Sequence, residues 1–168
     1  MFVALGAERP EVVWNPTPDQ VPTEPLKFLA ARWSDRAPDA PLPDVASIDP
    51  LDLKPALGHI MLLDPVEDGR DFRFRLYGSA VAGVSGFDFT RRLLSEHPAS
   101  GYVVEFMIAT SRAALRRRLP MFTTRRPVGA LETRTWLRLA IPFADDAGTV
   151  ARLLVGSVAL GRAGQVLG

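Results

Sequence analysis

The stretch that decides the fold is Asp71–Phe89, which reads DFRFRLYGSAVAGVSGFDF. Its first half alternates apolar or aromatic residues with arginines, and this period of two is typical of a strand with two unlike faces. Gly78 ends the alternation, and a short apolar stretch then leads to a second glycine and to Phe87 and Phe89. A strand, a glycine break, a short helix and an aromatic loop in this order indicate a sheet that passes into the helices covering one of its faces.

Length and composition set the outer limits. The chain has 168 residues, 47% of them hydrophobic and 23% charged, which predicts one soluble globular domain with an extension. A net charge of +1 gives no global attraction to nucleic acid or to an anionic membrane. Cysteine is absent, so disulfides, thiolate catalysis and flavin photochemistry that needs a reactive cysteine are excluded.

The sequence predicts no secretory or membrane-spanning segment. The apolar residues 1–6 follow no basic segment and are too few for a secretory core. The strongest late apolar run, Leu153–Leu160, has the length of a strand and is far too short to span a membrane. The expectation is a cytoplasmic protein that does not engage a membrane.

Prolines mark the organisation along the chain. Five of them punctuate residues 8–25, so residues 1–25 are expected to form an extended arm. Residues 26–163 are expected to form a single domain, with residues 164–168 as a tail. Leu26, Leu29 and Trp33 fall on one stripe at helical spacing and predict a helix at the start of this domain.

The remaining pattern alternates between strand and helix periods. Aspartate-proline at 49–50 is a helix start signal. The expected helices are 50–57, 79–84 and 100–119, and the expected strands are 59–63, 72–77, 121–124, 134–143 and 150–160. Two strands, a helical middle section and three more strands predict an α+β fold with a five-stranded, mainly antiparallel sheet, helices on one face and the N-terminal helix on or near the other.

Three strings carry a resemblance to a known family. The hairpin, short helices, long helix and three-strand meander follow the element order of a PAS domain. FRFRLYGSAVAGVSGFDFTRRL (72–93), SIDPLDLKPALGHIMLLD (47–64) and TWLRLAIPFADD (135–146) are similar to a group of compact, single-domain bacterial PAS-like proteins. The resemblance covers residues 26–160. Arg91 departs from it, because this group usually has a glycine there and arginine adopts a positive φ at greater cost.

The resemblance implies a sensory or signalling module with a pocket on the concave face of its sheet. The pocket is expected to take a small apolar or amphipathic molecule, such as a metabolite or a fatty-acid-like compound. Apolar residues of two strands and of the facing elements are the expected lining, with a few polar anchors. These ligand-binding candidates are Phe72, Phe74, Leu76, Leu137, Leu139 and Ile141 on the sheet, Phe87, Phe89, Val104 and Met107 opposite it, and Ser79, Tyr102 and Glu105 as anchors.

The other face of the sheet is the expected interaction surface. An exposed tryptophan and tyrosine are costly to leave in water, so the N-terminal helix or a second subunit is expected to cover them. The resemblance also implies homodimerisation, and a bacterial signalling protein is a possible further partner. The interface candidates are Arg75, Tyr77, Trp136 and Arg138 on the sheet and Leu29 and Trp33 on the helix.

No catalytic constellation accompanies this surface. His59 and His97 have no second ligand at metal-like spacing, so neither a metal nor haem is expected, and flavin is not expected either. The glycines at 78, 83 and 86 fit no phosphate loop, and the serines fit no nucleophile elbow. The protein is therefore expected not to be an enzyme.

An arginine cluster closes the long helix and continues beyond it, at 112, 116–118 and 125–126. Cations at a helix C-terminus are stabilised by the helix dipole, and no aromatic residues are interleaved with them as in nucleic-acid grooves. A solvated helix end is the simpler interpretation, and no nucleic-acid partner is expected.

Two alternatives to a ligand sensor stay open. The first is a homodimeric adaptor that binds no ligand. The second is a cone of the NTF2-like type, which hosts small-molecule binders and small enzymes but usually gathers its helices before most of the sheet.

Overall fold

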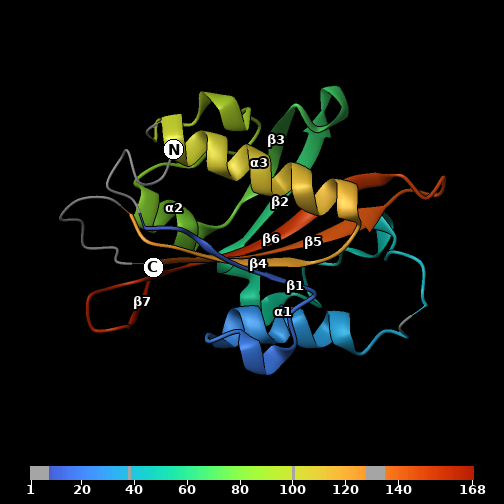
Figure 1. Ribbon diagram of the computed structural model, residues 1–168, viewed down its shortest axis with the longest axis horizontal. Helices are drawn as coiled ribbons and strands as arrows, with labels where there is room; N and C mark the ends of the chain where they lie inside the picture. The colour runs from blue at the N-terminus through green and yellow to red at the C-terminus, as the bar shows by residue number, and fades with distance from the viewer. Residues whose placement is uncertain (1–7, 38, 100, 128–134) are drawn as a thin grey trace.

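The computed structural model describes residues 8–37, 39–99, 101–127 and 135–168 as one sheet with helices on both faces (Figure 1). The α-helices are α1 (Glu24–Ser34), α2 (Ser79–Ser85) and α3 (Gly101–Arg117). Short 3₁₀ helices are η2 (Pro18–Gln20), η3 (Val45–Ser47), η4 (Lys54–His59), η5 (Glu67–Gly69) and η6 (Leu94–Glu96). The strands are β1 (Glu11–Trp14), β2 (Ile60–Val66), β3 (Asp71–Tyr77), β4 (Met121–Arg125), β5 (Thr135–Ala144), β6 (Val150–Leu160) and β7 (Val166–Leu167).

The sheet is antiparallel throughout, in the order β1-β4-β5-β6-β2-β3, with β7 paired to the end of β6. The α+β class and the order of hairpin, helices and meander are confirmed. The predicted count of five strands is wrong, because the described residues form seven. The prolines of the N-terminal segment flank β1 and do not interrupt it, so this edge strand escaped the pattern.

The described part of the N-terminal segment contains β1, η2 and the start of α1, and it packs against the rest of the domain. β1 pairs with β4 from Glu11 opposite Thr124 to Trp14 opposite Met121. Val21 has no exposed surface and belongs to the core beneath α1. At the other end of the chain, β7 ties part of the predicted tail to β6. Residues 1–7 lie outside the described residues.

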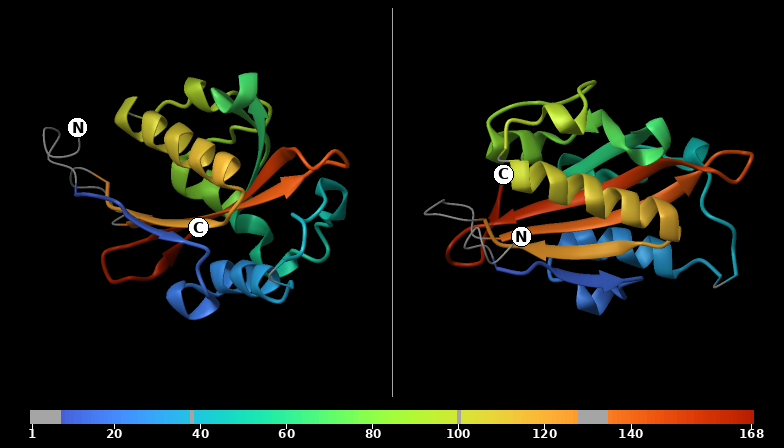
Figure 2. Two further views of the ribbon diagram at one scale, coloured as in Figure 1. Left: turned by 45° about the vertical axis from the view of Figure 1, so that its right-hand side comes forward. Right: turned by 45° about the horizontal axis from the view of Figure 1, so that its top comes forward.

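The sheet separates two cores. α2 and α3 cover one face, here called the α3 face, and α1 covers the other, the α1 face; both views of Figure 2 keep α1 and α3 on opposite sides. Phe72 and Phe74 are buried on the α3 face, as are Met107 and Phe89 opposite them. Leu26 and Leu29 of α1 are buried on the α1 face, which confirms the predicted helical stripe.

The predicted assignment of β5 to the two faces is wrong. Leu137, Leu139 and Ile141 pack on the α1 face, although they were expected beside Phe72 and Phe74. Trp136 and Ala140 contact the core on the α3 face, and Arg138 lies between them on the same side. Strand alternation identifies two sets of residues but does not say which helix each set meets.

A β-bulge in the first hairpin explains a second difference. The pairing of β2 with β3 shifts between Leu62 and Leu63, so that Leu62 pairs with Leu76 while Leu63 pairs with Phe74. The extra residue turns Leu76 to the α1 face and Tyr77 to the α3 face. Both were expected on the opposite sides, since unbroken alternation puts Leu76 beside Phe74.

Two glycines fix how the helices approach the sheet. A Cβ at Gly78 would lie 2.7 Å from the carbonyl oxygen of Ile60, so the junction of β3 and α2 can lie directly against the start of β2. A Cβ at Gly156 would lie 2.5 Å from a methyl group of Leu26 and 2.7 Å from one of Leu29. Because Gly156 has no side chain, Leu26 and Leu29 of α1 pack directly against the backbone of β6.

Arg91 adopts the conformation that the family pattern assigns to glycine. Its φ is +73°, in the left-handed region. The Arg91 N–H donates to the Phe74 carbonyl oxygen at 2.6 Å, and the Phe74 N–H donates to the Arg92 carbonyl oxygen at 3.0 Å. The turn in which Arg91 replaces glycine is therefore hydrogen-bonded to the edge strand β3, although arginine is unfavourable at this φ.

Candidate functional site

A pocket of about 300 Å³ opens on the α3 face, between the N-terminal part of α3 and strands β4 and β5. Its walls combine aromatic, apolar and basic side chains. The lining residues are Tyr77, Ser85, His97, Ala99, Tyr102, Val103, Met107, Arg125, Pro127, Trp136 and Arg138.

The floor of the pocket is a polar patch in the middle of the sheet. Arg138 of β5 pairs with Thr123 of β4 on one side and with Ser157 of β6 on the other. Arg125 pairs with Trp136, which places it diagonally beside Arg138. Diagonal neighbours on adjacent strands lie about 7–8 Å apart, so the two guanidinium groups can reach one small ligand.

The roof and side of the pocket come from α3 and α2. Tyr102 and Met107 descend from the first turns of α3, where Met107 is buried against the sheet. Tyr77, at the end of β3, and Ser85, in the last turn of α2, share a hydrogen bond of 3.0 Å between their hydroxyl groups. The bulge that turns Tyr77 inward therefore supplies part of the polar wall.

Arg125, which is buried, and Arg138, which is half-buried with a buried Nε, dominate the electrostatics. Burial lowers the pKa of Arg138 to about 10, with a further contribution from repulsion by Arg125. Burial likewise lowers the pKa of Arg125. Both groups stay charged at neutral pH, so each pays a desolvation cost. The Arg138 guanidinium also lies over the Trp136 ring, 5.9 Å from its centre.

Polar atoms in the floor lack partners. In the described part of the chain, Arg138 Nε and Ser157 Oγ are buried and form no hydrogen bond. A buried donor without an acceptor is rare in native proteins and costs free energy of about 1–3 kcal/mol, more for a charged group. The floor thus contains polar atoms, Arg138 Nε and Ser157 Oγ, that have no hydrogen-bond partner among the described residues and lie close to the pocket.

His97 closes one side of the pocket as a neutral ring. It lies between the rings of Phe87 and Phe89, with centroids 5.1 Å from each. Its Nδ1 accepts a hydrogen bond of 3.2 Å from the Ala99 N–H. Burial, with a smaller effect from the positive charge of Arg138, lowers the pKa of His97 to about 4. The sequence marked His97 as structural, and these contacts agree with that interpretation.

A much smaller hollow of about 20 Å³ lies deeper under α3 and shares Arg138 and Met107 with the pocket. Phe74, Thr123 and Ser111 also line it. Its volume suits one water molecule. Arg138 therefore stands between the open pocket and the packed core.

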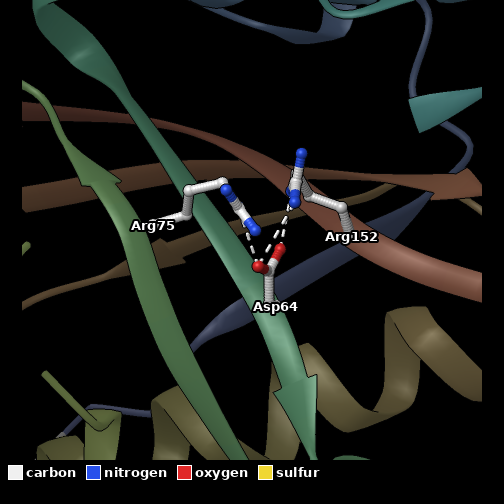
Figure 3. A network of polar contacts seen from close by, with 3 residues as sticks. All are labelled: Asp64, Arg75 and Arg152. Carbon is white, nitrogen blue, oxygen red and sulfur yellow. Dashed lines mark hydrogen bonds and ion pairs between the residues drawn. The ribbon is translucent and has the colours of Figure 1, made fainter. Parts of the chain in front are cut away.

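The α1 face carries a second polar cluster, which is fully paired. Asp64 of β2 accepts from Arg75 Nε of β3 at 2.9 Å and from Arg152 Nε of β6 at 2.6 Å (Figure 3). Burial acts to raise the pKa of Asp64, but the hydrogen bonds and charges of the two arginines outweigh it and leave the pKa below its usual value. This cluster links three strands, and each of its three charged groups has an oppositely charged partner.

A further hollow of about 220 Å³ lies between α1 and the segment around η3. Leu29, Trp33, Ile141 and Leu154 form its apolar wall, and four charged side chains stand at its rim. One rim pair, Arg32 and Asp52, forms an exposed ion pair of 3.7 Å. The rim charges of this hollow include both signs, whereas the charged side chains among the described lining residues of the α3-face pocket are arginines.

The ligand-binding candidates are divided between the two faces. Tyr102 and Met107 line the pocket, and Phe74 lines the smaller hollow. Phe87 and Phe89 support the pocket through His97, whereas Phe72 has no exposed surface and serves the core. Leu76, Leu137, Leu139 and Ile141 lie on the α1 face, away from it. Ser79 and Glu105 are exposed, Val104 packs against the α3-face core, and none of the three is among the lining residues.

The interface candidates are divided in the same way. Tyr77, Trp136 and Arg138 line the pocket on the α3 face, so the expectation that they share the outer surface is wrong. Leu29 is buried beneath α1, and Trp33 is half-buried with its indole N–H donating to Asn15 Oδ1 at 2.9 Å. Arg75 belongs to the Asp64 cluster.

The importance of Arg125 was missed, and that of Arg138 was assigned to the wrong surface. A signal for both exists in the alternation. Arg125 follows Met121 and Thr123 at intervals of two, and Arg138 stands between Trp136 and Ala140 in the same way. An arginine in register with residues that face a core is a sign of a buried charge.

The arginine cluster at the end of α3 does not act as one patch. Arg112 donates to the carbonyl oxygens of Gly69 and Arg70 at 2.7 and 2.9 Å, and so fastens α3 to the hairpin loop. Arg118 donates to the Gly148 carbonyl oxygen at 2.7 Å. Arg126 pairs with Glu8. These three side chains stabilise the fold. Arg125 differs from them because it lines the pocket.

Within the ranges that the structure describes, no three histidine or acidic side chains gather in a way that could hold a metal ion. Across the same ranges, no helix has both the length and the apolar character needed to cross a membrane.

Comparison with known proteins gives one finding. A family model described as PAS domain matches residues 21–158. No curated protein and no solved structure matches the chain.

Proposed function

The chain belongs to the PAS domain family, and from this membership we propose that it is a non-enzymatic sensory module. The module binds a small molecule in the pocket between α3 and the sheet. The state of the pocket then reaches a separate signalling protein through the surface of the domain.

The pocket is the observation that carries this proposal. Its volume of about 300 Å³ is at the lower end of the range for small-molecule sites. Val103, Met107 and Trp136 supply apolar contact surface, while the guanidinium groups of Arg125 and Arg138 supply polar anchors. A mostly apolar wall with a few placed polar groups is typical of such sites.

Native mass spectrometry of the freshly purified full chain tests the proposal. We expect a bound small molecule, or a thermal shift with at least one member of a metabolite panel. Val103→Trp fills the pocket and should abolish both signals. Leu119→Trp, at an exposed site beyond the end of α3, is the matched control and should keep them. Ligand-free spectra together with no thermal shift would contradict the proposal.

Homodimerisation through the α1 face is a second candidate. Leu62 and Leu76 pair across β2 and β3 on this face and remain only half-buried. A second copy of the chain would cover them. We expect a dimer by light scattering, which Leu76→Glu converts to a monomer, whereas Val166→Glu on the exposed β7 does not. A monomer at high concentration in the unaltered chain would count against this candidate.

A further inference from the structure

The two arginines in the floor of the pocket support an inference that rests on the ligand-binding function proposed above. Five ion pairs join side chains of the described residues, and none involves Arg125 or Arg138. Among the described residues, no carboxylate lines the pocket. Asp88, which acts electrostatically on Tyr77, is engaged by the N–H and the hydroxyl of Thr90 at 2.8 and 2.7 Å. The described walls of the pocket therefore carry two arginine charges and no carboxylate that could balance them.

A buried cation without a counter-charge is unfavourable, so its retention calls for an explanation. Arg125 is 7% exposed, and the Nε of Arg138 is buried with no acceptor among the described residues. The contrast with the α1 face is direct, because there the more exposed Arg75 has Asp64 as its partner. An anion that enters the pocket would supply the negative charge that the described walls lack.

We propose that the pocket binds a small amphipathic carboxylate. The carboxylate group accepts hydrogen bonds from the guanidinium groups of Arg138 and Arg125. The apolar part of the ligand lies against Trp136, Val103 and Met107.

The arrangement favours a carboxylate over a phosphate. The guanidinium group presents parallel N–H donors that match the two oxygens of a carboxylate. A phosphate needs donors for more oxygens and carries more charge at neutral pH. The nearby hydroxyl groups of Tyr77 and Ser85 already bond to each other, and the rest of the wall is largely apolar.

Calorimetric titration of the full chain with three probes tests this inference. Sodium octanoate carries both the carboxylate and the apolar tail, 1-octanol carries the tail alone, and inorganic phosphate carries an oxyanion without a tail. We expect octanoate to bind at least tenfold more tightly than either of the others. Phosphate binding as tight as that of octanoate would overturn the assignment of the apolar part.

Variants locate the binding to the floor. Arg138→Met keeps the length of the side chain without its charge, and octanoate affinity should fall at least tenfold while 1-octanol affinity is kept. Arg138→Lys keeps the charge without the paired donors. Its octanoate affinity should lie between those of the unaltered chain and of Arg138→Met. Arg75→Met, on the opposite face, is the matched control and should bind octanoate as the unaltered chain does. The ligand-free Arg138→Met protein should melt at a higher temperature than the unaltered chain, which shows that it folds.

The outcomes separate this inference from the proposed function. Tight binding of 1-octanol with no preference for octanoate would overturn the inference that the ligand is a carboxylate. It would leave the proposed ligand-binding function intact. An octanoate affinity that Arg138→Met does not reduce also overturns the carboxylate inference. Binding of none of the probes, together with ligand-free native mass spectra, overturns both.

Discussion

At the scale of single residues, substitution of Arg91 tests how much its positive φ destabilises the turn after α2. Its φ of +73° costs an L-amino acid roughly 1–2 kcal/mol relative to glycine, partly offset because glycine is freer in the unfolded chain. We expect Arg91→Gly to raise the free energy of unfolding by about 0.5–1 kcal/mol, measured by urea denaturation. Arg91→Ala keeps the Cβ and should give no such gain. A loss of stability in Arg91→Gly would show that the arginine side chain itself stabilises the turn.

His97 gives the domain a pH dependence with a definite sign. Its pKa is about 4 in the folded protein, against 6.5 for an ordinary histidine. Between these two values the unfolded chain binds a proton that the folded chain does not, so stability is full above about pH 6.5 and falls as the pH approaches 4. We expect a lower Tm at pH 5 than at pH 7.5 by scanning calorimetry.

The matched pair of histidine variants tests this origin. His97→Gln should reduce the difference in Tm between the two pH values, while His59→Gln should leave it unchanged. Equal behaviour of the two variants would contradict the assignment to His97.

At the scale of elements, the seating of α1 on β6 depends on the absence of one side chain. A methyl group at Gly156 would overlap Leu26 and Leu29, so Gly156→Ala must displace the helix. Overpacking of this kind costs roughly 1–3 kcal/mol. We expect a corresponding loss in the free energy of unfolding.

Gly83→Ala is the control for that substitution. Gly83 lies inside α2, and nothing stands within 4 Å of the position that a Cβ would take. Alanine is the better helix former by up to about 1 kcal/mol. The two glycine variants should therefore change stability in opposite directions, and a gain in both would mean that α1 yields easily.

The elements were largely predictable from the sequence, but their faces were not. The period of two in β3 and β5 and the apolar stripe of α1 are local patterns, so strand and helix could be recognised from them. The alternation places Leu137 and Arg138 on opposite faces of β5. Which of these faces packs against α1 and which against α3 is decided by tertiary packing, and no local pattern predicts it. The inward turn of Tyr77 depends on the bulge opposite Leu62, and no local pattern marks it. The pocket was therefore expected in the right layer, with half of its floor assigned to the wrong side.

At the scale of the whole molecule, the order of the sheet predicts a gradient of local stability. β5 and β6 lie in the middle and are covered on both faces, whereas β1 is an edge strand and β7 pairs over two residues only. We expect the amides of β5 and β6 to exchange most slowly with solvent and those of β1 and β7 fastest, by hydrogen exchange and mass spectrometry. Protection of β1 equal to that of β5 would mean that the N-terminal segment belongs to the most stable unit.

β5 carries the floor of the pocket on one side and the support of α1 on the other. Arg138 is directly bonded to Leu137 and Leu139, whose Cα atoms stand about 3.8 Å away along the backbone. Under the function proposed above, a ligand held by the guanidinium group would act directly on a strand whose other face packs in the same core as α1. If the proposed function is correct, we expect the coupling between the pocket and the surface of α1 to need no chain of intermediate side chains, because β5 borders both.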